Sequence, residues 1–169
     1  MDVQPFFLHP EFPREGVLRS EYVGRLGIDA QDVTRRVIEG AGFRFGPPPR
    51  IPYSLPALAV TELARDRGLH EPVHTRLMHA YWSEGVDIGE AEALLAVVTE
   101  AGLERGEAAG TIEGDGYVER VLDSTRRAQA HGINAIPAFV LDDRLLVMGA
   151  QPHGIFEQAF EMLKRERGA

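Results

Sequence analysis

The chain of 169 residues contains no cysteine. This absence excludes disulfide bonds, thiolate metal ligands, iron–sulfur clusters and every reaction in which a cysteine of the chain itself attacks a substrate. It does not fix the cellular compartment, because a protein without disulfide bonds can work anywhere. We therefore expect no catalytic thiol in this chain.

Basic residues are scarce as well, since 18 Lys and Arg residues stand against 26 Asp and Glu residues and give a net charge of -8. A surface that binds nucleic acid or an anionic membrane needs a basic patch. The two basic pairs, Arg35-Arg36 and Arg126-Arg127, lie in helical patterns with acidic neighbours. No apolar run approaches the roughly 18 residues that cross a bilayer, and Met1-Asp2-Val3 does not begin a signal peptide. We therefore expect a cytoplasmic protein that binds neither nucleic acid nor membranes.

Helical patterns dominate the middle of the chain. Apolar residues recur at helical spacing, and polar caps and glycines mark the helix ends. Asp29 and Ser54 are expected as N-caps and Gly68 as a C-terminal stop. The prolines at 47–49 cannot continue a helix and predict an extended loop. The expected helices span residues 20–27, 29–40, 54–68, 71–85, 90–101, 104–109 and 116–130.

Strand patterns occur only near the two ends of the chain. Asp2 to His9 is a short apolar segment with aromatic residues and predicts a strand. Two apolar runs, 138–141 and 144–148, flank the polar pair Asp142-Asp143 and predict a hairpin, after which Pro152 opens a final helix to about residue 165. These elements indicate an α/β fold with a small sheet, and the hydrophobic content of 44% is sufficient for a single domain over residues 1–169.

The string His70-Glu71-Pro72-Val73-His74 matches the zinc-binding pattern H-E-x-x-H. That pattern requires both histidines on one continuous helix. Gly68 ends the preceding helix, and Pro72 is accepted only in the first turn of the next, so His70 is expected at or before the helix start. Because no third ligand lies at suitable spacing, no metal site is expected.

Other motifs have simpler explanations. The pair Tyr81-Trp82 could stack on a ligand, but an aromatic pair near a helix end is more often part of the core and its rim. Gly114-Asp115-Gly116 lacks the ligands of a calcium or phosphate loop, and a turn explains it. Since there is no dinucleotide fingerprint and no nucleophile elbow, we expect no cofactor.

The segment 131–140 reads His-Gly-Ile-Asn-Ala-Ile-Pro-Ala-Phe-Val. A proline that enters an apolar strand cannot donate to the sheet, so Pro137 is expected at the first position of the strand or after a cis bond. The segment resembles the cis-proline loop of the thioredoxin superfamily, which reads Gly-Val-x-Gly-Val-Pro-x-Phe-Val in DsbA-like members. The matching residues are Gly132, Ile136, Pro137, Phe139 and Val140. Ala135 replaces the glycine that is common two residues before the proline.

Further segments extend the resemblance over essentially the whole chain. Residues 149–152 are similar to the Gly-Ala-Gln-Pro of FrnE-like proteins, whereas the related 2-hydroxychromene-2-carboxylate isomerases and kappa-class glutathione transferases usually differ there. The opening 5–10, with Pro13 to Gly16, resembles the second strand of the family and its exit loop, and 80–88 resembles its helical insertion. The chain thus resembles the FrnE-like branch of the DsbA-like thioredoxin superfamily.

The resemblance implies a thioredoxin-like α/β fold of the DsbA type. Residues 1–18 and 132–169 would form the thioredoxin core, and residues 19–131 a mainly helical insertion. Family members normally begin with a strand that leads into Cys-x-x-Cys at a helix N-terminus, and this strand–helix unit is expected to be missing here. Its strand would lie in the middle of the sheet. Three origins stay open: a sequence cut short at its start, a gene start assigned at an internal methionine, or a real loss.

The activity implied by the resemblance is thiol–disulfide exchange with protein or peptide substrates. Because this reaction requires a thiolate, the chain alone is expected to be redox-inactive and to contain no catalytic residue. By resemblance, Ala135, Ile136 and Pro137 bind the substrate: a cis Ile136–Pro137 bond would present the amide and carbonyl of Ile136 to an extended peptide.

Two alternatives stay open. One is a non-redox module that binds peptides or a partner subunit in the same groove, in which the open sheet favours a homodimer or a strand-swapped oligomer. The other is a glutathione-dependent small-molecule isomerase or transferase, which would need an upstream serine or a bound thiol cofactor.

Overall fold

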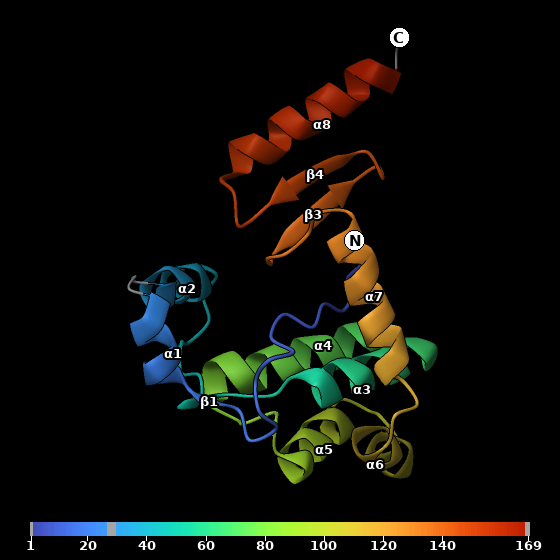
Figure 1. Ribbon diagram of the computed structural model, residues 1–169. Helices are drawn as coiled ribbons and strands as arrows, with labels where there is room; N and C mark the ends of the chain where they lie inside the picture. The colour runs from blue at the N-terminus through green and yellow to red at the C-terminus, as the bar shows by residue number, and fades with distance from the viewer. Residues whose placement is uncertain (1, 27–29, 168–169) are drawn as a thin grey trace. The chain divides into compact units, whose positions relative to one another are not determined.

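The computed structural model describes residues 2–26 and 30–167 of the chain (Figure 1). The chain divides into two compact units, residues 1–125 and residues 126–169. Helix α7 (Val118–Ala130) closes the first unit and opens the second. No helix among the described residues is long and apolar enough to cross a membrane.

The first unit consists mainly of helices. A short strand β1 (Val17–Leu18) leads into α1 (Arg19–Leu26) and α2 (Ala30–Gly40), and strand β2 (Arg50–Ile51) follows. The remaining elements of this unit are α3 (Leu55–Asp66), α4 (His70–His79), the π-helical turn η1 (Ala80–Glu84), α5 (Ala91–Glu100) and α6 (Arg105–Glu113).

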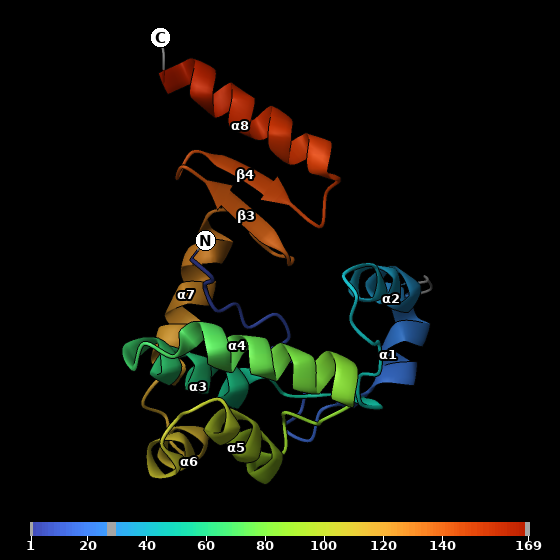
Figure 2. The ribbon, with the colours of Figure 1, turned by 180° about the vertical axis from the view of Figure 1, so that it is seen from behind.

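Helices α3 to α6 enclose the main apolar core. Figure 2 shows α3 and α4 side by side, with α5 and α6 beneath them. Their most deeply buried side chains recur three or four residues apart, which aligns them on the inward face of each helix. These side chains are Val60, Leu63, Val73, Leu77, Leu94 and Val98. Fully buried alanines at positions 64, 80 and 108 let the helix backbones approach closely.

The helices lie close to their expected positions, with three differences. Helix α4 begins at His70, one residue earlier than expected, and its continuation over 80–84 is π-helical. Helix α6 runs four residues further than expected, to Glu113. Ser54 precedes α3 but makes no side-chain capping bond. Its backbone is already near-helical, and Pro56 lacks one of the amides that a cap would bind. Asp29, the expected cap of α2, lies outside the described residues.

The expected strand at residues 2–9 is not present, and this prediction is wrong. The segment has no regular secondary structure, and its hydrogen bonds go to side chains of α3 and α7 instead of a neighbouring strand. The amide of Phe7 donates to Oγ1 of Thr125 at 2.9 Å, and Oγ of Ser124 donates to the carbonyl of Pro5 at 2.9 Å. Phe7 is 3% exposed and packs with buried Val121. No described strand pairs with this segment, so side-chain hydroxyls take over the role of a ladder.

A small antiparallel pair, β1 and β2, was not expected from the sequence. Val17 pairs with Ile51, directly after Gly16, whose φ is 71°. A Cβ atom at position 16 would lie 2.4 Å from the carbonyl oxygen of Ile51. Only glycine therefore fits where these two strands meet.

The second unit is a hairpin covered by one helix. Strands β3 (Ala138–Leu141) and β4 (Leu145–Met148) pair antiparallel, and α8 (His153–Arg167) packs on one face (Figure 1). The rings of Phe139 and Phe156 meet edge to face at 5.0 Å. The hairpin itself is confirmed, and its register leaves three residues, 142–144, between the paired Leu141 and Leu145 instead of the expected two.

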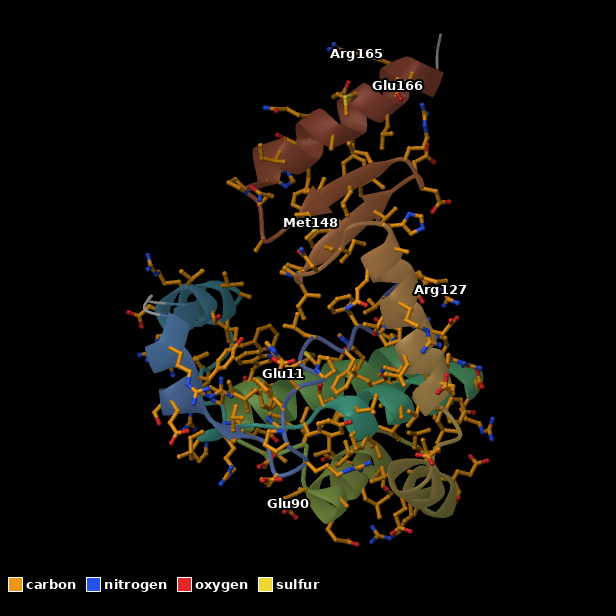
Figure 3. The ribbon with its side chains drawn as sticks, viewed as in Figure 1. Glu11, Glu90, Arg127, Met148, Arg165 and Glu166 are labelled. Carbon is orange, nitrogen blue, oxygen red and sulfur yellow. The ribbon has the colours of Figure 1, made fainter. Side chains whose placement is uncertain are left out.

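The turn and the end of α8 are tied together. Asp142 and Asp143 have φ values of 57° and 53°, a left-handed conformation that aspartate tolerates better than most residues. Arg144 then pairs with Glu166 at 2.6 Å. Figure 3 labels Glu166 near the end of α8 and Met148 on β4. This ion pair is exposed on both sides and fixes geometry more than it adds stability.

Candidate functional site

The loop before β3 begins where α7 ends. Gly132 has a φ of 78°, and the amide of Ile133 donates back to the carbonyl of Ala128 at 3.0 Å, which closes the helix end. Ile133 then turns inward and is 9% exposed. The end of α7 and the buried side chain of Ile133 therefore position residues 135–137 directly before β3.

Residues 135–137 form a bend, and the Ile136–Pro137 bond is cis, as the resemblance to the cis-proline loop implies. The carbonyl of Pro137 is occupied, because it accepts a hydrogen bond from the amide of Gly149 at 2.8 Å. Pro137 is thus fixed against the residue that follows β4.

The three residues expected to bind substrate, Ala135, Ile136 and Pro137, are all exposed, and Ile136 is 52% exposed. Within the part of the chain that the structure describes, neither the amide nor the carbonyl of Ile136 has a backbone partner. The loop therefore offers an apolar side chain together with one free donor and one free acceptor. Such a set can hold an extended peptide but can break no bond in it.

A second feature of this unit is a groove of about 430 Å³ between β4 and α8. Its apolar wall comes from both elements and includes Leu146, Met148, Ile155 and Met162. The side-chain amide of Gln151 donates to the carbonyl of Met148 at 2.7 Å and shapes one end of the groove. The sequence indicated a hairpin and a helix here, but not a groove, because its depth depends on how far α8 stands from β4.

The histidine pair of the H-E-x-x-H string lies in the first unit. Since α4 begins at His70, both His70 and His74 belong to the same helix, with stacked rings 5.7 Å apart. Nη2 of Arg65 lies 3.2 Å from Nε2 of His70. A guanidinium can only donate, so it occupies the lone pair that a metal would need. Among the described residues, no cluster of metal-ligating side chains is present.

Both histidines favour the neutral form. Burial lowers the pKa of His74, and the neighbouring His70 lowers it further. Burial lowers the pKa of His70 too, and the cationic Arg65 adds to that shift. Below the ordinary histidine pKa of about 6.5, the unfolded chain therefore binds more protons than the folded one.

We expect the free energy of unfolding of the first unit to be highest above about pH 6.5, where these histidines are neutral in both states. It should fall as the pH drops through the lowered pKa values. His74→Gln should reduce this fall, because the variant has no imidazole to protonate on unfolding. Urea midpoints at pH 7.5 and pH 5.5 measure the effect. His131→Gln, which changes an exposed histidine, is the matched control. An unchanged pH dependence in His74→Gln would contradict the expectation.

The comparisons with known proteins agree with this architecture. The family profile of the DSBA-like thioredoxin domain matches residues 1–161. The chain belongs to this family. A crystal structure of a probable DsbA oxidoreductase from Streptomyces coelicolor superposes with a TM-score of 0.81 at 22% sequence identity and covers 91% of this chain and 70% of the other. Comparison with curated proteins gave no match.

The expected fold class is therefore confirmed: the chain has the DsbA-like thioredoxin fold, rich in helices and with few strands. As a member of the DSBA-like family, it is related to thiol–disulfide oxidoreductases, whose reaction needs the thiolate that these 169 residues lack. The loop at 135–137 is the part of the candidate site that the sequence analysis predicted.

Proposed function

We propose that the chain binds extended segments of protein substrates at Ala135, Ile136 and Pro137. In this proposal it is the substrate-binding part of a FrnE-like thiol–disulfide oxidoreductase, and the reactive dithiol comes from outside these residues. One observation carries the proposal: Ile136 combines a half-exposed apolar side chain with an amide and a carbonyl that have no backbone partner among the described residues.

Backbone pairing suits a site that must accept many sequences. An extended peptide that adds to a strand entrance gains main-chain hydrogen bonds whatever its side chains are. The apolar side chain of Ile136 then favours segments with hydrophobic residues, which are the ones that unfolded proteins expose. The position in the family's cis-proline loop supports the same assignment, because Gly132, Ile136, Pro137, Phe139 and Val140 match that loop.

The experiment is a binding titration with the insulin B chain, S-alkylated so that no disulfide can form and labelled with fluorescein. Fluorescence polarisation should show saturable binding to the wild-type chain. Ile136→Asp should weaken it about tenfold or more, since it removes apolar contact and places a charge where the peptide must be desolvated.

Val37→Asp is the matched control, because Val37 is also an exposed β-branched apolar residue, 56% exposed, but lies on α2 in the first unit. It should leave binding within about twofold of wild type. Equal loss in both variants would indicate a general surface effect and would contradict the assignment of Ile136. Absence of saturable binding by the wild-type chain would contradict the proposal as a whole.

A non-redox binding module is the second candidate, and the exposed apolar side chains of the second unit favour it. Six large side chains there are at least 38% exposed, namely Ile136, Val140, Leu146, Ile155, Phe160 and Met162. Residues 126–169 hold six Lys and Arg residues against five Asp and Glu residues, so two copies would repel each other little through this part. A homodimer or strand-swapped oligomer stays a prediction, which light scattering at several concentrations tests.

The remaining predictions have their own tests. The FrnE-like branch rests on the Gly-Ala-Gln-Pro at 149–152, and translation of the upstream DNA tests for the Cys-x-x-Cys unit. A cytoplasmic location and a single domain over 1–169 are proposed with it. A glutathione-dependent activity stays a prediction that calorimetric titration with glutathione would address.

A further inference from the structure

Arg19, the first residue of α1, carries a charge that no acidic side chain among the described residues neutralises. Its Nε donates to the carbonyl of Pro48 at 2.9 Å, and its Nη2 donates to the hydroxyl of Tyr81 at 2.5 Å. Within the described ranges, no carboxylate lies within ion-pairing distance of its guanidinium. Other arginines of this acidic chain, such as Arg67 and Arg76, do have carboxylate partners.

Aromatic rings surround this cation. The guanidinium carbon of Arg19 lies 5.5 Å from the ring centre of Tyr81 and 5.8 Å from that of Trp82, within the range of cation–π attraction. The attraction holds the guanidinium in place without removing its charge. Burial raises the pKa of the Tyr81 hydroxyl, and the negative charge of Asp87 adds to this rise. The carboxylate of Asp87 makes its own hydrogen bond elsewhere, since it accepts the amide of Gly89 at 3.0 Å.

Arg19 also lines a pocket of about 90 Å³ between α1, α2, β2 and the π-helical turn η1. The other walls combine aromatic, aliphatic and neutral polar side chains: Tyr22, Val23, Gln31, Thr34, Phe45, Ile51 and Trp82. Pockets for nucleotides and drug-sized ligands measure about 300 Å³ or more. The size therefore restricts the pocket to a small molecule or to one end of a larger one.

The aromatic wall is fixed by backbone contacts. Trp82 lies in the π-helical turn η1, and its carbonyl accepts the amide of Gly46 at 2.7 Å. This bond places Phe45 beside Trp82, with stacked ring centres 6.2 Å apart. Arg35 lies 5.3 Å from the ring centre of Phe45 and is paired with Asp32 at 3.9 Å, so it adds little net charge here. Single π-helical turns are frequent at functional sites, because they displace side chains from the regular helical pattern.

We propose that this pocket binds a small organic carboxylate. The guanidinium of Arg19 supplies the charge-assisted hydrogen bond, and Trp82 and Phe45 receive the apolar part of the ligand. A carboxylate fits better than a cation, since Arg19 gives the wall a positive charge and no acidic side chain among the described residues lines the pocket. The site is separate from the loop at 135–137 and does not depend on the function proposed for that loop.

Trp82 makes the proposal directly testable, because it is the only tryptophan of the chain. Benzoate titrated into the full chain should change the tryptophan fluorescence and saturate. Benzamide has the same shape without the charge, and its affinity should be lower by a factor of about ten or more. Acetate should compete with benzoate, because both ligands carry the carboxylate that Arg19 is proposed to bind.

Arg19→Gln should weaken benzoate binding about tenfold or more, and Arg19→Lys should weaken it less. Arg14→Gln is the matched control: Arg14 also lies over a tyrosine ring, that of Tyr53, but outside the pocket, and the variant should bind as wild type does. Circular dichroism checks that each variant folds.

Three results would overturn the proposal: no saturable change with benzoate, equal binding of benzamide, or failure of acetate to compete. All three use the wild-type chain, so they decide the question even if Arg19→Gln does not fold. Binding unchanged in a folded Arg19→Gln would also overturn it and would leave Arg19 as a structural link between Pro48 and Tyr81.

Discussion

The 169-residue chain is expected to show no turnover in an insulin-reduction assay with dithiothreitol, and none in the oxidation of a dithiol peptide. Thiol–disulfide exchange proceeds when a thiolate attacks a disulfide sulfur and forms a mixed disulfide. The chain has no cysteine, so neither the attack nor the mixed disulfide can occur on it. No other side chain can replace the thiolate, because sulfur is both the nucleophile and the atom that changes oxidation state.

Two measurements make this result informative. Insulin reduction is followed by turbidity against dithiothreitol alone, and peptide oxidation by chromatography against the uncatalysed reaction. The same preparation is tested for binding of the labelled B chain. Binding shows that the inactive chain is folded, so the lack of turnover is not caused by unfolding. Turnover above background by material whose mass proves the absence of cysteine would contradict the expectation.

Local signals in the sequence were sufficient for the elements of the second unit. The hairpin follows from two apolar runs around Asp142-Asp143, and the cis bond was expected from a proline at a strand entrance together with the resemblance of its neighbours to the cis-proline loop. Each depends on the conformational preferences of a few adjacent residues. The three-residue loop was not predictable in the same way, because the register is set by pairing along both strands.

The opening segment shows where local signals fail. Residues 2–9 have strand-like composition, yet a strand exists only when a neighbour offers a ladder. Here Ser124 and Thr125, more than a hundred residues away, supply the hydrogen bonds of Pro5 and Phe7. The spacing of these residues in the sequence does not predict that contact.

The pocket at Arg19 was missed for a related reason. The sequence marked Tyr81 and Trp82 as core and rim, and Tyr81 is indeed buried at 7% exposure. The charge beside them comes from α1, some sixty residues earlier, and the π-helical turn that orients them has no reliable sequence signature. Such a site appears only when distant segments are brought together.

Leu77→Ala is expected to destabilise the helical unit by about 2–5 kcal/mol. Leu77 is 2% exposed, in the centre of the core that α3, α4, α5 and α6 share. The truncation removes buried apolar surface and leaves a cavity that close-packed helices cannot fill. Because whole-domain stabilities are about 5–15 kcal/mol, such a loss is large enough to unfold a substantial part of the population.

Met78→Ala is the matched control, since Met78 is the next residue of α4 and is 40% exposed. It should cost less than about 1 kcal/mol. Urea unfolding followed by Trp82 fluorescence reports the helical unit, and hydrogen exchange at β3 and β4 reports the second unit. If residues 1–169 form one domain, Leu77→Ala will speed exchange in both units. Faster exchange confined to residues before 126 would contradict the single-domain prediction, and equal costs for the two variants would contradict the assignment of the core.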